Sequence, residues 1–371
     1  MKEYIPEHFY NKYYNPILNE CLEKLEEDFQ KNFYVEIELY VKNFENICNK
    51  IIQQYPNFKV GYIMYNCMLH KILNHNYSYD IYVYNKDWYF GEEIKIGEYN
   101  VNFVYKYFDE VWQKLLSNYR GYVNKIVATD INNLMIEMVK IFNNYVIAIL
   151  RNSITKATEI KEYKNLNKEQ LLYIQCGKFY DNCEFVYKEN AEKNIIKIKK
   201  ELNKSKSKKH IFEDFQNLNF DYFDFEEFDI RYSDFRYSSL KNVNFRFSSL
   251  EGAKFNNADL DYSNFSYSAI NNVNFENANL TNCKFNFTIM SKGKNKFMNP
   301  FLTGFLSSNF NVADLSNSDF SNSILYYIDF TNSILQNTNF ENCKLYNCRF
   351  THSQVKDLIL NDEQINDLVI I

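Results

Sequence analysis

The chain is poor in the residues that most often interrupt regular structure. Its 371 residues include only 4 prolines and 8 glycines. Long apolar runs are also missing, because the most apolar stretch, Leu134 to Leu150, contains two charged residues and two asparagines. A membrane-spanning helix needs about 20 predominantly apolar residues, so we predict no membrane span. Met1 to Pro6 has no basic segment followed by an apolar one, and we expect no signal peptide and a cytoplasmic location.

Motifs that carry chemistry are equally scarce. None of the eight cysteines lies in a Cys-x-x-Cys pair, which argues against a zinc site or a disulfide framework. No P-loop, Gly-x-Gly-x-x-Gly, Gly-x-Ser-x-Gly or His-Glu-x-x-His motif is present. His70 and His75 are five residues apart and would not share a helical face well. We therefore predict no metal, no cofactor and no enzymatic activity, with residues 1–211 left open.

What the chain does have is a repeat of five residues. Bulky apolar residues recur at every fifth position from Phe215 to Leu360, in one phase that only Asn295 and Pro300 interrupt. Two residues before most of them lies a small side chain, as Ser238 lies before Leu240. Neither a helix nor a strand keeps such a pattern on one side. A short fixed period instead indicates a chain that coils and stacks each turn on the previous one.

The repeat also carries a recognisable consensus. The stretches Ala258 to Tyr262, Ala278 to Asn282 and Ala313 to Asn317 read A(D/N)LXX, which resembles the consensus of the pentapeptide-repeat family. The resemblance covers only the C-terminal part of the chain. It implies a right-handed quadrilateral β-helix, with four pentapeptides per coil and both the bulky and the small residue pointing inward. At about 4.8 Å per coil, the coils would stack into a rod on the order of 35 Å long.

We therefore predict an α+β multi-domain protein. Residues 1–192 are expected to form a mainly helical domain with a small β-meander, and 193–211 a lysine-rich helix end and linker. Residues 212–360 are expected to form the β-helix, interrupted by a loop insertion at 291–304. Residues 361–371 resemble a short helix that would cap the last coil or make a homodimer contact.

Apolar spacing predicts the elements of the N-terminal region. Helices are expected over residues 16–55, 60–73, 103–127, 130–155 and 168–202, with Thr129 or Asp130 as the N-cap of the fourth. Three short segments separated by turn residues predict an antiparallel meander: Ile81 to Tyr84, Trp88 to Phe90 and Ile94 to Gly97. Trp88 and Trp112 are interpreted as core anchors, with a ligand platform as the alternative.

Charge differs between the two parts. Residues 212–371 carry 20 acidic and 12 basic side chains, whereas the remainder carries 27 acidic and 30 basic ones. The lysines before residue 211 meet a run of acids after it, which suggests that this linker folds against the first coils and protects their edge. Binding of the lysines to nucleic acid is the alternative. Within the repeat, charges of opposite sign lie four pentapeptides apart, which predicts ion-pair ladders between coils.

Three groups of residues are candidates for partner binding. A column of outward aromatic residues is predicted on one face, where it would receive a partner or be covered by residues 1–211: Phe247, Tyr267, Phe287 and Tyr327. The loop insertion contributes Lys292, Lys294, Lys296, Phe297 and Phe301. A local acidic face would contain Asp314, Asp319 and Asp329.

These features favour a non-enzymatic scaffold that presents a rigid rod to a protein partner. The family resemblance implies an alternative, since some members protect DNA gyrase or topoisomerase IV by imitating duplex DNA. That activity needs uncompensated negative charge, and Arg231, Arg236, Lys241 and Arg246 would weaken it. A second alternative is an enzyme or toxin module in residues 1–211. Direct contact with nucleic acid or a membrane is not expected.

Overall fold

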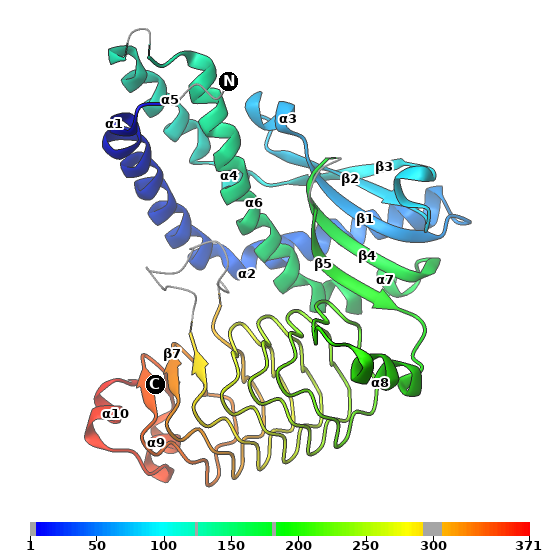
Figure 1. Ribbon diagram of the computed structural model, residues 1–371, viewed down its shortest axis with the longest axis vertical. Coiled ribbons are helices and arrows are strands. Elements are labelled where there is room, and N and C mark those ends of the chain that lie inside the picture. The colour runs from blue at the N-terminus through cyan, green and yellow to red at the C-terminus, as the bar shows by residue number, and fades with distance from the viewer. Residues whose placement is uncertain (1–4, 123–124, 180–182, 292–305) are drawn as a thin grey trace. The chain divides into compact units, whose positions relative to one another are not determined.

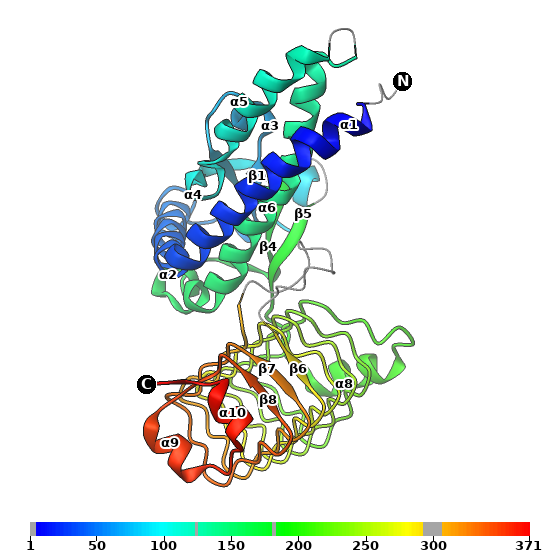
Figure 2. The same cartoon turned by 90° about the vertical axis from the view of Figure 1, so that its left-hand side faces the viewer.

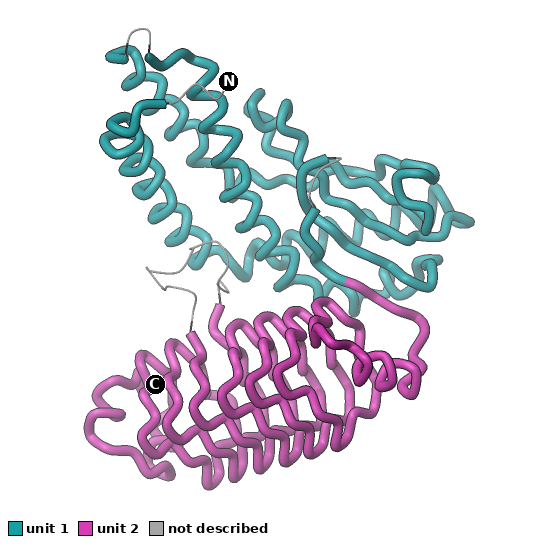
Figure 3. The backbone as a smooth tube through the Cα atoms, in the orientation of Figure 1, with its two compact units in different colours: residues 1–187 teal, residues 188–371 magenta. Residues whose placement is uncertain are grey.

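The computed structural model describes residues 5–122, 125–179, 183–291 and 306–371. It divides into two compact units, residues 1–187 and residues 188–371 (Figure 3). The boundary falls within one strand, five residues before the predicted end of the first domain. Each unit is described on its own below.

Helices supply one part of unit 1. The chain enters through α1 (Glu7–Phe9) and a π-helical turn, Tyr10–Tyr14, and continues as α2 (Asn15–Gln54), which ends just before Pro56. Further along lie α4 (Asn102–Tyr105), α5 (Phe108–Asn118), α6 (Ala128–Glu159) and α7 (Lys161–Lys164) (Figure 1). The predicted helices at 16–55 and 130–155 are confirmed. The one predicted over 103–127 is instead broken at Lys106 and Tyr107 and ends at Asn118, before a short 3-10 turn.

A five-stranded sheet supplies the other part, in the order β3-β2-β1-β4-β5. Its strands are β1 (Val60–Cys67), β2 (Ser78–Tyr84), β3 (Ile94–Asn100), β4 (Lys168–Lys178) and β5 (Cys183–Asn190). β1 pairs antiparallel with β2 and parallel with β4, and β2 pairs antiparallel with β3. The predicted meander is therefore right for β2 and β3, but Trp88–Phe90 forms a 3-10 turn between them rather than a strand.

Two predicted helices of unit 1 are wrong. Residues 60–73 form β1 and the short α3 (Leu69–Leu73), and residues 168–202 form β4, β5 and part of a later helix. Seven of the eight residues of β1 are buried, because it is a central strand with both faces covered. Such a strand loses the alternation of apolar and polar residues and cannot be distinguished from a buried helix by periodicity. Unit 1 is thus an α+β unit, with more strand than predicted.

The N-cap of α6 differs from the predicted one. It is Val127, not Thr129 or Asp130. Asp130 instead occupies the third helical position, where its carboxylate accepts a 2.9 Å hydrogen bond from the backbone N–H of Val127. In the part of the chain that the structure describes, α6 alone is long and apolar enough to cross a membrane, and 61% of its most apolar segment is buried in the protein.

Unit 2 is a solenoid whose coils each contain four pentapeptides. Parallel bridges join residues four pentapeptides apart, beginning with Lys209 and Asp229 and continuing coil by coil. Figure 2 shows the coils stacked edge to edge, with β6 (Ile289–Met290), β7 (Ile324–Tyr326) and β8 (Lys344–Tyr346) along one side. Pentapeptide repeats of this kind imply a right-handed β-helix. The last coil ends at β9 (Arg349–Phe350), because α9 (His352–Asp357) follows.

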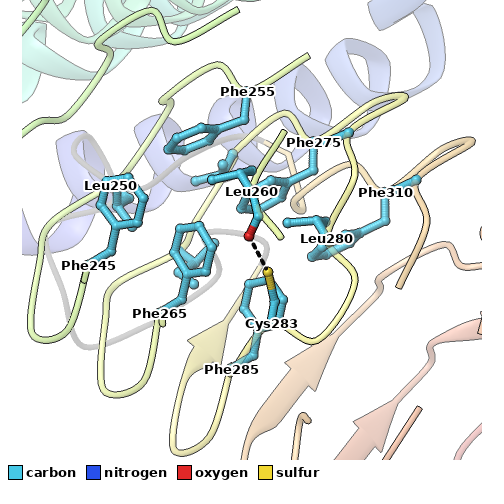
Figure 4. Packing of buried hydrophobic residues seen from close by; sticks show 14 of the residues in the cluster. Phe245, Leu250, Phe255, Leu260, Phe265, Phe275, Leu280, Cys283, Phe285 and Phe310 are labelled. Atoms are coloured by element: carbon cyan, nitrogen blue, oxygen red, sulfur yellow. Dashed lines mark hydrogen bonds between the residues drawn. The ribbon is translucent and has the colours of Figure 1, made fainter. Parts of the chain in front are cut away.

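The core of unit 2 alternates two kinds of side chain. From Phe225 on, phenylalanine occupies two opposite sides of a coil, and leucine, isoleucine or methionine occupies the other two, as Phe245, Leu250, Phe255 and Leu260 illustrate (Figure 4). Rings in successive coils stack, with centroids 5.0 Å apart and planes 3° apart for Phe265 and Phe285. Rings on opposite sides of the solenoid, such as those of Phe265 and Phe275, meet edge to face. Such pairs add about 0.5–1.5 kcal/mol beyond the area they bury.

The small inward residues tie each coil to the previous one. The hydroxyl of Ser248 donates to the carbonyl of Phe225 at 2.6 Å, and that of Ser263 donates to the carbonyl of Leu240 at 2.6 Å. Cys283 fills the same position and contacts the carbonyl of Leu260 through its sulfur at 3.1 Å (Figure 4). Where this position holds serine or cysteine, as in these three cases, the side chain therefore bonds to a backbone carbonyl one coil away, whereas alanine at Ala253, Ala258 and Ala278 only fills the space.

Both ends of the solenoid are covered. At the first coil, α8 (Ile195–Lys204) packs Ile195, Ile198 and buried Leu202 against the core. Lys193 and Asp214 form an ion pair at 2.5 Å, and Lys208 and Glu227 form one at 3.2 Å. The lysine-rich segment does fold against the first coils: residues Ile195–Lys204 are helical, and the residues after them lead directly into the first pentapeptides.

The C-terminal residues cover the last coil. Val355, Leu358, Leu360 and Leu368 pack against its core, so Val355 and Leu360 belong to the cap and not to the repeat. α10 (Asp362–Asn366) and β10 (Val369–Ile370) complete this cap, and β10 pairs in parallel with β9. The buried amide of Gln364 donates to the carbonyls of Phe340 and Cys343. The strand edge of the last coil is thereby paired, which removes a site for aggregation.

Candidate interaction surface

The residue two places after each bulky inward residue, here called the corner position, adopts left-handed backbone angles. Its φ lies near +60° in nearly every pentapeptide, for example +59° at Asn257 and +58° at Asn282. Asparagine tolerates this region better than other residues that carry a side chain. The many asparagines at corner positions are therefore explained first by backbone geometry. They also form amide hydrogen bonds between coils, as Asn337 does with Asn317 at 3.2 Å.

Three successive coils place aromatic residues at one corner position, here called the aromatic column: Phe247, Tyr267 and Phe287. Their φ angles are +57°, +63° and +58°, and the side chains are 49%, 46% and 48% exposed. Neighbouring rings stack with centroids 5.1 Å and 4.8 Å apart. The guanidinium of Arg246 lies 5.1 Å from the Phe247 ring centroid and 5.9 Å from that of Tyr267.

Tyr327 does not belong to this column, and its predicted placement is wrong. Across the interruption the bridge partner of a residue lies seven pentapeptides on instead of four, since Asn274 pairs with Asn309 and Lys284 with Asp319. The insertion therefore adds three pentapeptides. Bulky residues still recur at every fifth position, but each later pentapeptide lies three sides further round the coil than it would in an uninterrupted repeat. The aromatic column continues into Asn322, which lies seven pentapeptides after Phe287.

The column that contains Tyr327 runs through Phe212, Tyr232, Gly252 and Asn272 on the same register. The rings of Phe212 and Tyr232 stack with centroids 4.8 Å apart. Tyr232 then lies over Gly252, where a Cβ atom would come within 2.4 Å of its ring. The glycine, whose φ is +67°, both accommodates the tyrosine and takes the left-handed angle without cost.

The three acids predicted to share a face lie on different sides of the solenoid. Asp314 bridges to Ile334, Asp319 to Asn339 and Asp329 to Arg349, each in the next coil. Each carboxylate also accepts a hydrogen bond from the backbone N–H two residues later, at 3.0 Å in all three cases. Asp329 is in addition paired with Arg349 at 3.2 Å. These acids stabilise the turns of the coil and do not form a common negative surface.

Several basic residues of the solenoid form ion pairs, but only some of these pairs join neighbouring coils as predicted. Arg231 pairs with Asp229 at 2.8 Å, Arg236 with Asp234 at 2.8 Å and Lys241 with Asp259 at 2.9 Å. The two arginine pairs lie two residues apart within one coil rather than one coil apart. Burial is the largest single influence on Asp229 and raises its pKa, but the hydrogen bonds and the positive charge of Arg231, together with the charge of Lys209, outweigh it, so the pKa falls below its ordinary value.

The candidate residues of the insertion lie outside the described residues: Lys292, Lys294, Lys296, Phe297 and Phe301. The described inward residues that flank the insertion are Met290, on one side of a coil, and Phe310, on the next side. The predicted recognition role of this loop stays a prediction.

Unit 1 offers little recognisable chemistry. Within residues 5–122, 125–179, 183–291 and 306–371, no three His, Cys, Asp or Glu side chains are grouped to hold a metal ion. His75 lies on the surface, where its Nδ1 is 2.7 Å from Asp109 and its ring is 5.3 Å from that of Trp112. Burial raises the pKa of the Cys67 thiol to about 11, which keeps it protonated and unreactive near neutral pH.

Trp88 is half-buried and packs on the face of the central strand β1 rather than filling the core. Its ring stacks on Tyr62 with centroids 5.3 Å apart, and its indole N–H lies 3.1 Å from the sulfur of Met64. Both contacts are within unit 1. These contacts hold the 3-10 turn between β2 and β3 against the face of β1.

Comparison with known proteins bears on unit 2. A family model described as pentapeptide repeats, in 8 copies, matches residues 238–277, 263–292 and 313–352. No curated protein matches the chain.

Solved structures that resemble it include a pentapeptide repeat protein from the thylakoid lumen of Arabidopsis thaliana, at 21% identity, which covers 40% of this chain and 73% of that one with a TM-score of 0.20. A trypsin-treated form of QnrB1, a plasmid-mediated fluoroquinolone resistance protein, aligns at 14% identity over 44% of this chain and 84% of its own, with a TM-score of 0.24. HetL, a pentapeptide repeat protein of the cyanobacterium Nostoc involved in heterocyst differentiation regulation, aligns at 11% identity over 41% of this chain and 94% of its own, with a TM-score of 0.17. The family model thus identifies residues 238–292 and 313–352 as pentapeptide repeats.

Proposed function

We propose that the protein is a non-enzymatic cytoplasmic scaffold whose solenoid presents the aromatic column to a protein partner. The observation that carries this proposal is the choice of residue at three successive corner positions. Asparagine fits the left-handed backbone there, yet Phe247, Tyr267 and Phe287 stand in its place with about half of each side chain exposed.

That choice has an energetic cost which packing inside the coil does not repay. A residue with a Cβ atom in the left-handed region costs roughly 1–2 kcal/mol, and rings that stay about half exposed regain only part of the free energy that full burial would give. Ring stacking between coils returns about 0.5–1.5 kcal/mol per pair. Retaining three rings in a row is therefore explained best by a use outside the fold.

The composition of the surface indicates a protein as the partner. Aromatic residues and arginine are enriched at the centres of protein interfaces, where they carry much of the binding energy. Arg246 lies beside the rings of Phe247 and Tyr267, so one flat surface combines ring edges with a cation. Rigid coils below and above hold the rings in place, which lowers the entropy lost on binding.

The test is a triple substitution, Phe247→Asn, Tyr267→Asn and Phe287→Asn, in the full-length protein. Asparagine suits the left-handed angle, so this variant should stay folded, as circular dichroism would show. A partner captured by wild type from native lysate, identified by mass spectrometry, should be lost. The matched control is Tyr222→Asn with Tyr262→Asn, which removes exposed tyrosines from a different column and should retain the partner. Equal capture by wild type and both variants would refute the role of the aromatic column.

The alternative is a DNA mimic that protects a type II topoisomerase, suggested by the fluoroquinolone resistance named for QnrB1. The pairing of Arg231, Arg236 and Lys241 with acids of the same or neighbouring coils argues against it. Mimicry requires negative charge that is left for the enzyme to neutralise. A supercoiling assay with gyrase or topoisomerase IV, with and without a fluoroquinolone, decides the matter: rescue at micromolar protein would make the alternative the better proposal.

A further inference from the structure

The helix α8 presents one face to the solenoid and the opposite face to solvent. Figure 1 shows it at the end of the solenoid that holds the first coils. Three of its apolar residues pack against the core: Ile195, Ile198 and Leu202. With 3.6 residues per turn, Ile196, Lys200 and Lys204 follow one another along the opposite side of the helix. These three residues are here called the outer ridge.

Some lysines around α8 already have partners within unit 2. Lys193 and Lys208 form ion pairs with acids of the first coils, and Lys197 pairs at 3.3 Å with the acid five residues before it. The ammonium group of Lys199 lies 5.6 Å from the ring centroid of Phe220. These four lysines hold the cap in place and are explained by the fold.

The outer ridge is not explained in this way. Lys200, Lys204 and Lys206 are exposed, and none of them forms an ion pair with any residue that the structure describes. Lys200 and Lys204 lie four residues apart on one helical face, where like charges repel each other. Ile196 stands beside them with its side chain 79% exposed. Neither the clustered charges nor the exposed isoleucine stabilises the helix.

The cap at the other end of the solenoid shows that capping does not require lysine. Residues 351–371 contain one lysine and four acids, whereas residues 193–209 contain eight lysines and one acid. Both segments cover the apolar core of a terminal coil. A polar outer surface is all that a terminal cap needs, so the net charge of +7 on residues 193–209 has another cause.

The acids of the first coil do not cancel the charge of the outer ridge. Seven acids lie between Glu213 and Asp229, on the coil against which α8 packs. A helix is about 10 Å across, and the ridge lies on the side of α8 that faces away from this coil. That separation is about one Debye length at physiological salt. The positive charge of the ridge therefore remains available to a partner.

We propose that the outer ridge binds the surface of an anionic phospholipid membrane. Clustered lysines on an amphipathic helix are attracted to the anionic lipids of the cytoplasmic leaflet, and each lysine near the surface adds to the binding. Their long side chains reach the headgroups while the helix stays on the solenoid. The contact is peripheral, and it departs from the prediction that the chain does not meet a membrane.

Ile196 favours a lipid surface over a nucleic acid. An exposed alkyl side chain gains free energy when it enters the boundary between headgroups and acyl chains, and it gains none beside a sugar–phosphate backbone. Proteins that bind nucleic acids commonly combine basic residues with arginine or with aromatic rings that stack on bases. Residues 188–211 contain no arginine and no phenylalanine, tyrosine or tryptophan.

Co-sedimentation of the full-length protein with lipid vesicles tests the proposal. One set of vesicles contains phosphatidylcholine alone, and the other contains phosphatidylserine as about one lipid in three. At about 0.1 M salt we expect the protein to sediment with the second set alone. Release is expected at about 0.5 M salt, where the Debye length is roughly halved. Folded protein that stays in solution with phosphatidylserine vesicles at low salt would overturn the proposal.

Two variants locate the contact. Lys200→Glu with Lys204→Glu reverses the charge of the outer ridge and should lower binding to phosphatidylserine vesicles at least about tenfold. Ile196→Asn keeps every charge and should lower it about threefold or more, because the apolar contact is lost. All three side chains face solvent, so circular dichroism should show both variants folded. Unchanged binding by both variants would refute the outer ridge as the contact.

The matched control is a charge reversal of the same size on α2, Lys31→Glu with Lys42→Glu. Both lysines are exposed, and this variant should bind the vesicles as wild type does. Equal losses in the two reversed pairs would show attraction by net charge alone and would refute the site.

A second ligand, duplex DNA of mixed sequence, separates the two polyanions. If the protein binds this DNA and does not bind the vesicles, the ridge belongs to a nucleic-acid site and the proposal is wrong. The aromatic column has no residue on α8, so the proposal stands or fails independently of the proposed function.

Discussion

The two units bury their apolar residues in different ways. In unit 2 nearly every inward side chain meets its counterpart in the next coil, as Phe245 meets Phe265 and Phe265 meets Phe285. In unit 1 the sheet joins strands that are distant in sequence, such as β1 and β4, between which β2, β3 and several helices intervene. In a repeat protein, the free energy of unfolding is approximately a sum of one contribution from each coil and one from each contact between neighbouring coils. A sheet such as that of unit 1 depends on all its strands at once.

The largest effect should come from the core of a coil. Phe265→Ala removes a fully buried ring that contacts Phe245, Phe255, Phe275 and Phe285. A loss of about 3–5 kcal/mol in the free energy of unfolding is expected. Chemical denaturation followed by circular dichroism measures it. Phe287→Ala, two residues after an inward position, is the control and should change stability by less than about 1 kcal/mol. Similar losses in both variants would contradict the inward and outward assignment.

Ion pairs in successive sides of one coil give the next largest effect. Asp234 and Arg236 are 2% and 1% exposed, whereas Asp229 and Arg231 are 24% and 39% exposed. Asp234→Ala leaves a buried guanidinium without its carboxylate and should cost about 3–5 kcal/mol. Asp229→Ala should cost no more than about 1 kcal/mol. Melting curves of both variants at equal salt test this difference, and equal shifts would show that the buried pair contributes no more to stability than the exposed one.

The same contrast between units explains which predictions the sequence could support. The coil contacts of unit 2 recur at a fixed spacing, so a one-dimensional pattern is enough to find the repeat and its inward residues. In unit 1, β1 is covered on both faces and β4 is buried over its second half, so their apolar runs carry no period of two. The helices predicted at 60–73 and 168–202 failed for that reason. The periodicity of a local stretch of sequence does not indicate which strands pair with one another in a sheet.

The sequence does contain a signal for the shift that moves Tyr327 into another column. Before the interruption phenylalanine alternates with leucine or isoleucine, so that Phe265, Phe275 and Phe285 fall two pentapeptides apart. After it, Phe310, Phe320 and Phe330 keep the spacing of ten residues. They stand, however, at the positions where an uninterrupted alternation would place leucine or isoleucine. Such a change requires an insertion of an odd number of pentapeptides. The period of five could not reveal it, but the period of ten does.

That Asn66, Asp80 and Glu98 lie opposite one another in the sheet of unit 1 could not have been found in this way. The three residues come together only through the register of β1 with β2 and of β2 with β3, and residues 60–73 were predicted to be helical. The aromatic column was within reach, because its residues lie one coil apart in an uninterrupted part of the repeat. Contacts between regular coils are thus predictable, while those that depend on strand pairing are not.

A smaller effect distinguishes the corner positions themselves. Val312 has a φ of +58° and is 54% exposed, so a β-branched residue stands where asparagine fits. Val312→Asn should raise the free energy of unfolding by about 1 kcal/mol. The reverse change at Asn322, whose φ is +59°, should lower it by a similar amount. Denaturant titrations of the two variants check the pair. If both changes had the same sign, backbone geometry would not be the reason for asparagine at these positions.

The smallest effect should come from shortening the interruption by whole pentapeptides. Removing residues 292–306 deletes three pentapeptides and restores the regular step of four between Asn274 and its partner Asn309. The inward phase is kept and the insertion is removed as whole pentapeptides, so the free energy of unfolding should change by less than about 1 kcal/mol. Removing 291–304 instead shifts every later residue by one place and turns Phe310, Leu315 and Phe320 away from the core. Circular dichroism and limited proteolysis of the two variants measure the difference, and loss of the last coils in the first variant would contradict the register of seven pentapeptides across the interruption. If that variant folds but no longer captures the partner that wild type binds, the interruption contributes to recognition.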